Sequence, residues 1–109
     1  MEVGSHLPLA PRDLLILSVL AGGPLHGYGI IKAVETTSES GVLLDPANLY
    51  RVLRRMRSLA WIAEAHSEGE RRRSFELTPF GREVLAAELG RLERLLLQTR
   101  PALVDGDVG

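Results

Sequence analysis

Cysteine is absent from the 109 residues, and this absence excludes several kinds of chemistry at once. Without a thiol the chain can form no disulfide, no thiolate metal site and no cysteine nucleophile. The three histidines, His6, His26 and His66, are scattered, and no two of them are spaced four residues apart as on a metal-binding helix. We therefore expect no metal and no cofactor, and the lack of cysteine fits a reducing, cytoplasmic environment.

Catalytic signatures and long apolar runs are also missing. The sequence shows no Ser–His–acid spacing and no glycine-rich phosphate loop after a strand, so we do not expect an enzyme. The apolar run from Leu14 to Leu20 is too short to span a bilayer as a helix, and we expect no membrane partner. A secretory signal, with Arg12 before this run, is an alternative that we rank below the first helix of a folded domain.

A strong net charge is missing too, since the formal value is -1. Bulk charge therefore argues neither for nor against nucleic acid as a partner. The distribution is uneven, because arginines crowd two short stretches at 51–57 and 71–73 while acidic residues concentrate elsewhere. A local basic surface on a nearly neutral protein can still bind phosphates.

What remains is the composition of one globular domain. The chain has 45% hydrophobic and 25% charged residues, which is ordinary for a soluble globular protein. A chain of this length buries only a limited core by itself, so additional burial through self-association is plausible before any motif is considered.

Breaks and helix-start signals divide the first half of the chain. Residues 1–10 show no periodicity, and we expect a flexible N-terminal arm. Pro11 starts a helix over 11–21, where its missing N–H costs nothing. This helix is apolar almost all round, so a strand is the competing interpretation. After the break at 22–24, a second helix is predicted over 27–38.

The middle of the chain predicts a third helix and a hairpin. Asp45 at the N-cap followed by Pro46 is a strong start for a helix that runs to about residue 60. Two short β-prone segments then follow within 61–67 and 71–77, joined by a turn that contains glycine.

The C-terminal part predicts a single long helix. Thr78 and Pro79 repeat the cap-plus-proline start, the helix covers 79–100, and Pro101 ends it before a flexible tail at 101–109. Three helices followed by a hairpin is the pattern of a winged helix-turn-helix. The predicted fold is therefore mainly α with a small β-hairpin (α+β), with a winged helix-turn-helix domain over 11–78 and a long C-terminal dimerisation helix.

Four segments in this order resemble the PadR family of bacterial transcriptional regulators. They read LLIL at 14–17, PLHGYGI at 24–30, DPANLYRVLRRM at 45–56 and RRRSFELTPFG at 71–81. The resemblance covers about residues 12–97 and fits the short branch of the family, with a single C-terminal helix. It implies a homodimer of winged-helix domains, joined largely through that helix, that binds double-stranded operator DNA and is often released by a small-molecule inducer.

The chain departs from the family pattern at three places. Trp61 stands where the family usually has glycine before the first wing strand, and Ser74-Phe75 replaces a pair of aromatic residues. The C-terminal helix contains no tryptophan, so drug binding by stacking on an interface tryptophan is not expected here.

The third helix is the candidate recognition helix, because a helix fits the major groove and reads base edges from its outer face. Arginine can bind guanine through two hydrogen bonds, asparagine can do the same with adenine, and a tyrosine hydroxyl can reach a phosphate. The alternative is a solvated basic face with the tyrosine half-packed in the core. The candidate DNA-binding residues on this helix are Asn48, Tyr50, Arg51, Arg54 and Arg55.

Further DNA contacts are expected from the wing and from the second helix. Arg71, Arg72 and Arg73 begin the second wing strand and could follow the phosphate backbone or enter the minor groove. The alternative is a solvated charge run partly neutralised by acidic neighbours. At the start of the second helix, backbone N–H groups suit phosphate oxygens, and Tyr28 and Lys32 could support that contact. Tyr28 could equally be a core aromatic.

The leucines of the long helix predict the dimer interface. Leu85, Leu89, Leu92 and Leu96 are spaced four, three and four residues apart, which is a heptad seam, and Leu95 adds to it. The later leucines would form an exposed stripe on a monomer. Two further expectations concern the same helix: Gly90 permits close approach of a partner helix or stands there by chance, and Glu88 and Arg91 pair while facing water.

These observations predict a cytoplasmic, sequence-specific DNA-binding transcriptional regulator, and the resemblance implies that it is a repressor released by a small-molecule inducer. The alternative is a winged helix used as a protein-interaction module without DNA binding. Such a module would tend to carry an acidic or apolar third helix, whereas this one is rich in arginine. A non-specific architectural DNA binder is disfavoured by the net charge. The sequence does not reveal the operator or the regulated genes.

Overall fold

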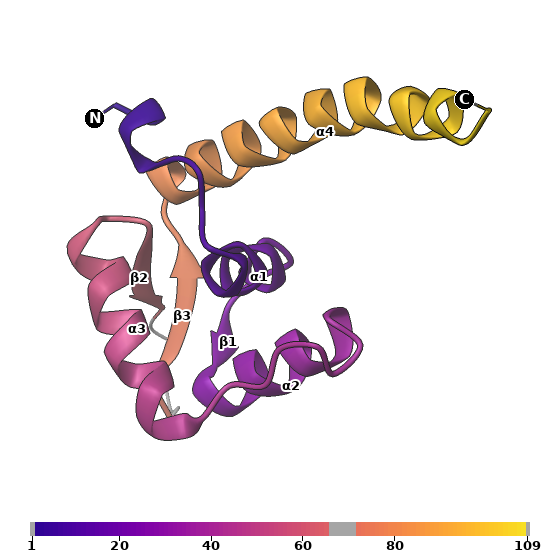
Figure 1. Cartoon of the computed structure of the whole chain (residues 1–109). Helices are drawn as coiled ribbons and strands as arrows, with labels where there is room; N and C mark the ends of the chain where they lie inside the picture. Colours follow the sequence, from indigo (N-terminus) through magenta and orange to yellow (C-terminus); the bar gives the residue numbers. More distant parts are fainter. Residues whose placement is uncertain (1, 66–71, 109) are drawn as a thin grey trace.

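The computed structural model describes residues 2–65 and 72–108, and only the backbone of 105–108. In chain order the elements are η1 (Gly4–His6, a 3-10 helix), α1 (Pro11–Leu20), β1 (Leu25–His26), α2 (Gly27–Thr37), α3 (Pro46–Ser58), β2 (Ile62–Ala65), β3 (Ser74–Leu77) and α4 (Pro79–Val108). Figure 1 shows α1, α2 and α3 grouped around a small sheet, with α4 extending away from them. The predicted class, mainly helical with a small sheet and a long C-terminal helix, is confirmed.

One hydrophobic core joins the three short helices, the sheet and the start of α4. The apolar run that could have been a strand is the helix α1, and its residues Ile16, Leu17 and Leu20 are fully buried. A helix that is apolar on most sides belongs in the middle of a fold. The other elements add buried side chains that include Ile30, Val34, Leu49, Leu53, Met56, Phe75 and Val84.

The sheet has three antiparallel strands in the order β1-β3-β2. The predicted wing hairpin supplies β2 and β3, with Ile62 opposite Leu77 and Ala65 opposite Ser74. The turn expected at 68–70 lies outside the described residues. The sequence did not predict β1, which pairs Leu25 with Phe75, because a two-residue strand shows no periodicity.

The turn between α3 and β2 corrects one expectation from the sequence. The residue with left-handed backbone is Ala60, at φ 65°, and not Trp61. Glycine is therefore favoured at position 60, where a side chain costs energy at positive φ. Trp61 is instead a core residue, 3% exposed.

The start of α4 is fixed by Thr78 and Gly81. The Thr78 hydroxyl accepts a hydrogen bond from the Gly81 amide at 2.9 Å and lies 3.2 Å from the Trp61 carbonyl oxygen, to which it donates. A Cβ on Gly81 would lie 2.8 Å from the Trp61 carbonyl carbon and closer still to its oxygen. Glycine at this position thus allows α4 to pack directly against the backbone that leads into the wing.

The N-terminal segment is packed, which differs from the flexible arm that the sequence predicts. Trp61 Nε1 donates a 2.9 Å hydrogen bond to His6 Nδ1, and the His6 ring lies edge-on to Phe80. Leu9 is 8% exposed, and its amide donates to Glu88. Local periodicity could not reveal these contacts, because every partner lies at least 55 residues further along the chain.

The expected pair of Glu88 with Arg91 is present, but Glu88 is buried, so the expectation that it faces water was wrong. Its carboxylate accepts hydrogen bonds from Arg91 Nε at 2.5 Å and from the Leu9 amide at 2.7 Å. The hydrogen bond from Arg91 lowers the pKa of Glu88 below its ordinary value of 4.5, against the effect of burial, and the Leu9 amide acts in the same direction. Arg91 in turn has a raised pKa because Glu88 accepts its hydrogen bond.

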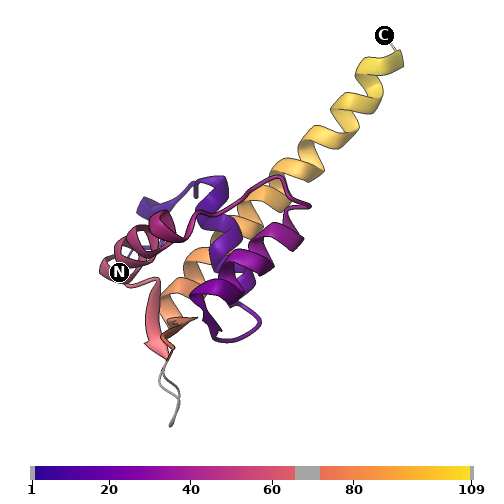
Figure 2. The ribbon, with the colours of Figure 1, turned by 90° about the horizontal axis from the view of Figure 1, so that it is seen from below.

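The helix α4 runs to Val108, whereas the sequence placed its end at Pro101. Pro101 lacks a backbone donor and its ring crowds the carbonyl of Leu97, yet its fixed φ is close to the helical value and the helix continues through it. The second half of α4 projects beyond the other elements (Figure 2). In the part of the chain that the structure describes, no helix is long and apolar enough to cross a membrane.

Candidate nucleic-acid interface

The outer face of α3 carries the residues predicted to read DNA. Asp45 caps the helix by accepting a hydrogen bond from the Ala47 amide, and the buried stripe turns one side of the helix into the core. The polar side is left in solvent. All five predicted residues are exposed there: Asn48, Tyr50, Arg51, Arg54 and Arg55.

These exposed residues fall into a central row and two flanks. With 100° of rotation per residue, Tyr50 and Arg55 lie about 140° apart around α3, and Arg51 and Arg54 lie between them. The Tyr50 flank faces the sheet and the start of α2, whereas the Arg55 flank faces α1. A helix with this arrangement can present two central arginines to a groove while its flanks face the borders of that groove.

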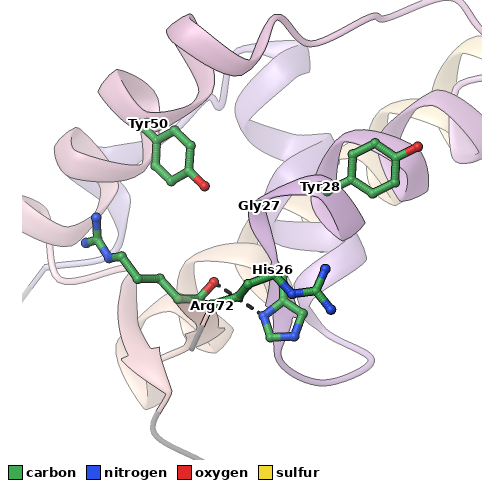
Figure 3. Close-up of a pocket in the computed structure, with 6 residues that line it drawn as sticks. His26, Gly27, Tyr28, Tyr50 and Arg72 are labelled. Carbon is green, nitrogen blue, oxygen red and sulfur yellow. Dashed lines mark hydrogen bonds between the residues drawn. The ribbon is translucent and has the colours of Figure 1, made fainter. Parts of the chain in front are cut away.

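The Tyr50 flank borders a hollow of about 500 Å³, which we call the wing hollow. Figure 3 shows the Tyr50 hydroxyl directed toward the start of α2, where a Cβ on Gly27 would lie 2.7 Å from it. The absence of a side chain on Gly27 therefore leaves room for this hydroxyl. The wing hollow is lined by His26, Gly27, Tyr28, Tyr50, Arg72 and Arg73.

Residues of α2 face the same side of the molecule. Tyr28 is 65% exposed, so it is not a core aromatic, and its ring is directed away from Tyr50 (Figure 3). The ammonium of Lys32 lies 5.6 Å from the centre of the Tyr28 ring and 3.8 Å from the Glu35 carboxylate. Both Tyr28 and Lys32 are thus available to a ligand that approaches the first turns of α2.

His26 is the N-cap residue of α2, but its side chain makes no capping hydrogen bond. Its Nδ1 lies 3.4 Å from the Arg73 carbonyl oxygen, which connects the start of α2 to the wing.

The three wing arginines differ in how they are engaged. Arg72 is exposed, whereas Arg73 pairs with Glu64 and lies over the Phe75 ring at 5.4 Å. Arg71 lies outside the described residues. Among the described residues, Glu64 on the facing strand is the acidic neighbour that pairs with this run, and Glu68 and Glu70 lie outside them.

On the other flank, Arg55 is held by a buried carboxylate. Its guanidinium donates to Asp13 Oδ2 at 2.5 Å, and its Cζ lies 5.5 Å from the centre of the Trp61 ring. Asp13 is 5% exposed and lies in the first turn of α1. Arg55 is therefore partly engaged within the protein, although its side chain remains 44% exposed.

The leucines predicted for a dimer interface divide into two groups. Leu85 is 6% exposed and packs in the core of this chain, so its position needs no partner. Leu89, Leu95 and Leu96 are about half exposed, and Leu92 is intermediate. The predicted stripe is therefore unpartnered only from Leu89 onward.

Two residues of this interface were missed by sequence reasoning, Arg12 and Asp13. The sequence does contain a signal for them, because two charged residues stand at the start of an otherwise apolar helix. Its place beside α3 could not be read from the sequence, since Asp13 and Arg55 are 42 residues apart. In the described part of the chain, no group of acidic and histidine side chains could hold a metal ion.

Comparison with known proteins agrees with this geometry. The chain matches the model of the transcriptional regulator PadR-like family over residues 16–87. It is 43% identical over 83 residues to an uncharacterized 37.1 kDa protein in transposon TN4556 of Streptomyces fradiae, with 76% of this chain covered. The chain spans only 23% of that relative.

Two solved structures show the same fold. A PadR family transcription regulator from hypervirulent Clostridium difficile is 27% identical, with a TM-score of 0.65 and coverage of 83% of this chain and 98% of that one. Bacillus subtilis PadR in complex with operator DNA is 20% identical, with a TM-score of 0.62 and coverage of 75% and 48%. Since the family model matches well over half of the sequence, the chain belongs to the PadR-like family, whose members are transcriptional regulators and not enzymes.

Proposed function

We propose that this protein is a cytoplasmic repressor that binds a specific double-stranded operator as a homodimer and is released by a small-molecule inducer. The observation that carries the proposal is the outer face of α3, where Arg51 and Arg54 lie exposed between two basic flanks. A helix of this kind fits the major groove, and its central arginines meet base edges.

Each part of the surface has a chemical role in this proposal. Arg51 and Arg54 bind guanine edges through paired hydrogen bonds, and Asn48 binds adenine. The Tyr50 hydroxyl and the free backbone N–H groups at the start of α2 bind phosphate oxygens, with Lys32 adding charge.

The wing contributes a less selective contact. Arg72 is exposed two residues before β3, the second wing strand, and from there it can reach a phosphate or a narrow minor groove. Arg73 is already paired with Glu64, so we assign the larger part of the wing contact to Arg72. Bacillus subtilis PadR, which has this fold, was solved with operator DNA, and that complex supports DNA as the partner.

The exposed half of α4 supports the homodimer in this proposal. The helix has 30 residues, which corresponds to about 45 Å, and only its first turns contact the core. A stripe that starts at Leu89 continues the core face into solvent, where isolated monomers generally avoid apolar patches. A second copy that covers this stripe would place two α3 helices on one operator, with half-sites about one DNA turn, or roughly 34 Å, apart.

The alternative of a protein-interaction module is less well supported. A partner helix or peptide would call for an apolar or acidic face, whereas the exposed residues of α3 include four arginines and no acidic residue. The geometry of α3 concerns DNA binding alone. Repression and release by an inducer are proposed from the family resemblance.

The proposal is tested by titrating the purified protein against the promoter DNA just upstream of its own gene, with salt varied. Because a dimer neutralises several phosphates, affinity should fall by orders of magnitude between about 50 and 200 mM salt. Binding that is absent, or that does not change with salt, would contradict DNA as the partner and favour the interaction module.

A further inference from the structure

A second hollow lies on the flank of α3 that faces away from the wing. It measures about 300 Å³ and combines the first turn of α1 with α3. We call it the α1 hollow. Its lining residues are Arg12, Asn48, Arg51, Val52 and Arg55.

The charges of the α1 hollow are unbalanced. Three of the five lining residues are arginines and none is acidic. The carboxylate beside them is Asp13, whose Oδ2 accepts from Arg55 at 2.5 Å and whose Oδ1 lies 3.8 Å from Arg12 Nε. One carboxylate for three guanidinium groups leaves a net positive site.

Asp13 also organises this site. Its carboxylate is almost fully buried, and Oδ1 has no hydrogen-bond partner among the residues that the structure describes. A buried carboxylate between two guanidinium groups fixes Arg55 and draws Arg12 toward the same point. The remaining N–H groups of these arginines are then free to bind an anion, and guanidinium groups bind phosphate through paired hydrogen bonds.

The position of the α1 hollow identifies the anion. A helix in the major groove lies between two phosphate backbones, and the wing hollow already occupies one flank of α3. The α1 hollow occupies the opposite flank and shares Arg51 with the central row. We propose that Arg12, together with Arg55, binds a phosphodiester group of the DNA backbone on the flank opposite the wing, while Arg51 at the border of the hollow stays with the central row that reads bases. This inference rests on the proposed function and adds α1 to the DNA-binding surface.

The first test compares Arg12→Ala with Arg82→Ala, which removes an exposed arginine from α4 outside both hollows. Arg12→Ala should weaken binding to operator and to unrelated DNA by a similar factor, roughly tenfold. It should also reduce the slope of log affinity against log salt by about 0.9 per protomer, whereas Arg82→Ala should leave it unchanged. Arg12→Lys keeps the charge but not the planar fork, and should retain the slope with an intermediate affinity.

A phosphate-ethylation interference experiment locates the contact. At least one phosphate in each half-site should inhibit wild-type binding when ethylated and have no such effect on Arg12→Ala. An Arg12→Ala protein with the wild-type interference pattern and salt slope would overturn the inference. If Arg51→Ala still weakens operator binding in that case, the proposed function survives; if neither variant has any effect, DNA binding through α3 fails as well.

A third measurement separates DNA phosphate from a free phosphate ligand. Trp61 is the single tryptophan, and Arg55 lies over its ring, so its fluorescence reports on the α1 hollow. Inorganic phosphate, compared with chloride at equal ionic strength, should change this fluorescence only weakly and at high concentration. Tight binding of free phosphate together with unchanged DNA binding by Arg12→Ala would reassign the hollow to a small ligand and refute the DNA contact.

Discussion

The backbone amide of Leu9 donates a 2.7 Å hydrogen bond to the carboxylate of Glu88, which lies 79 residues later in the chain. The bond joins the N-terminal segment to α4 at the point where α4 leaves the core. Glu88 is 1% exposed and also accepts two hydrogen bonds from Arg91. A buried charge is stable only with such partners, so this pair fixes how the arm and the long helix pack together.

Replacement of Glu88 should destabilise the fold to an extent that depends on the new side chain. Glu88→Leu leaves the Leu9 amide buried without an acceptor, and we expect a loss of about 1–3 kcal/mol in the free energy of unfolding. Glu88→Gln keeps an acceptor and should lose less. Urea denaturation of the three proteins at neutral pH measures both values, and an equal loss in the two variants would contradict the hydrogen bond to Leu9.

The same carboxylate predicts a pH dependence. The pKa of Glu88 is lowered in the folded protein, chiefly by the hydrogen bond from Arg91, so the ionised form favours the folded state. Its contribution is complete above the ordinary pKa of 4.5 and disappears as the pH falls through the lower, folded-state pKa. The stability difference between wild type and Glu88→Gln should therefore shrink below about pH 4. If the stability difference between the two proteins stays constant from neutral pH to about pH 3, the stabilising role of ionised Glu88 is refuted.

Gly81→Ala should destabilise the protein although alanine favours helices. The added Cβ would collide with the Trp61 backbone carbonyl, which cannot rotate away as a side chain could. Overpacking of this kind costs about 1–3 kcal/mol or more, against a helix-propensity gain of about 1 kcal/mol. Thermal denaturation measures the net loss.

Gly29→Ala is the matched control for this substitution. Gly29 lies within α2, and an added Cβ would meet Leu25 at the ordinary contact distance of 3.6 Å. This variant should be as stable as wild type or more stable by up to about 1 kcal/mol. If Gly81→Ala were stabilised to the same degree, the close approach of α4 to Trp61 would be wrong.

The order of the elements could be predicted because residues adjacent in the sequence mark where the helices begin. Asp45-Pro46 and Thr78-Pro79 mark the beginnings of α3 and α4, and the apolar stripe of α3 identifies its buried face. The exposed arginines of α3 follow directly from that stripe. What could not be predicted depends on contacts between distant residues, namely β1, the packed arm and the two α1 charges beside α3.

Arg55 shows the same limit within the candidate site. Helical periodicity places it on the outer face, and it is indeed exposed. Its ion pair with Asp13 depends on how α1 packs against α3, for which the local sequence holds no pattern. Arg55→Ala would remove both a DNA contact and this ion pair. A weaker affinity of this variant for DNA could therefore come from the lost contact or from a less stable fold.

Arg51→Ala is therefore the cleaner test of base reading. We expect it to weaken operator binding by about 1–3 kcal/mol and to relax sequence preference, because a base-edge contact is lost. Arg72→Ala in the wing should weaken all DNA sequences by a similar factor. Mobility-shift titrations with operator, single-substituted operators and unrelated DNA distinguish the two. Unchanged operator affinity in Arg51→Ala would refute α3 as the recognition helix.

The outer half of α4 gives the prediction that connects the fold to the operator. Helical spacing aligns Leu92 and Leu96 with Leu85, which packs in the core of the same chain. Beyond the core this face has no partner within the described chain, and we propose a second copy as its cover. Leu97 is 68% exposed but lies on a different side of the helix, about 120° from the row of Leu92 and Leu96 on average.

This geometry allows a matched pair of variants. Leu92→Asp with Leu96→Asp should convert the dimer to a monomer and weaken operator binding at least 100-fold, an effect of about 3 kcal/mol or more, because two leucines that the proposed interface would bury become charged. The helical circular dichroism signal should remain largely intact, since both positions lie beyond the core of the monomer. Leu97→Asp adds one equivalent charge off the stripe and should stay dimeric. Sedimentation velocity at micromolar concentration decides the matter: a monomeric wild type would refute the dimer, and a monomeric Leu97→Asp would show that the interface uses another face of α4.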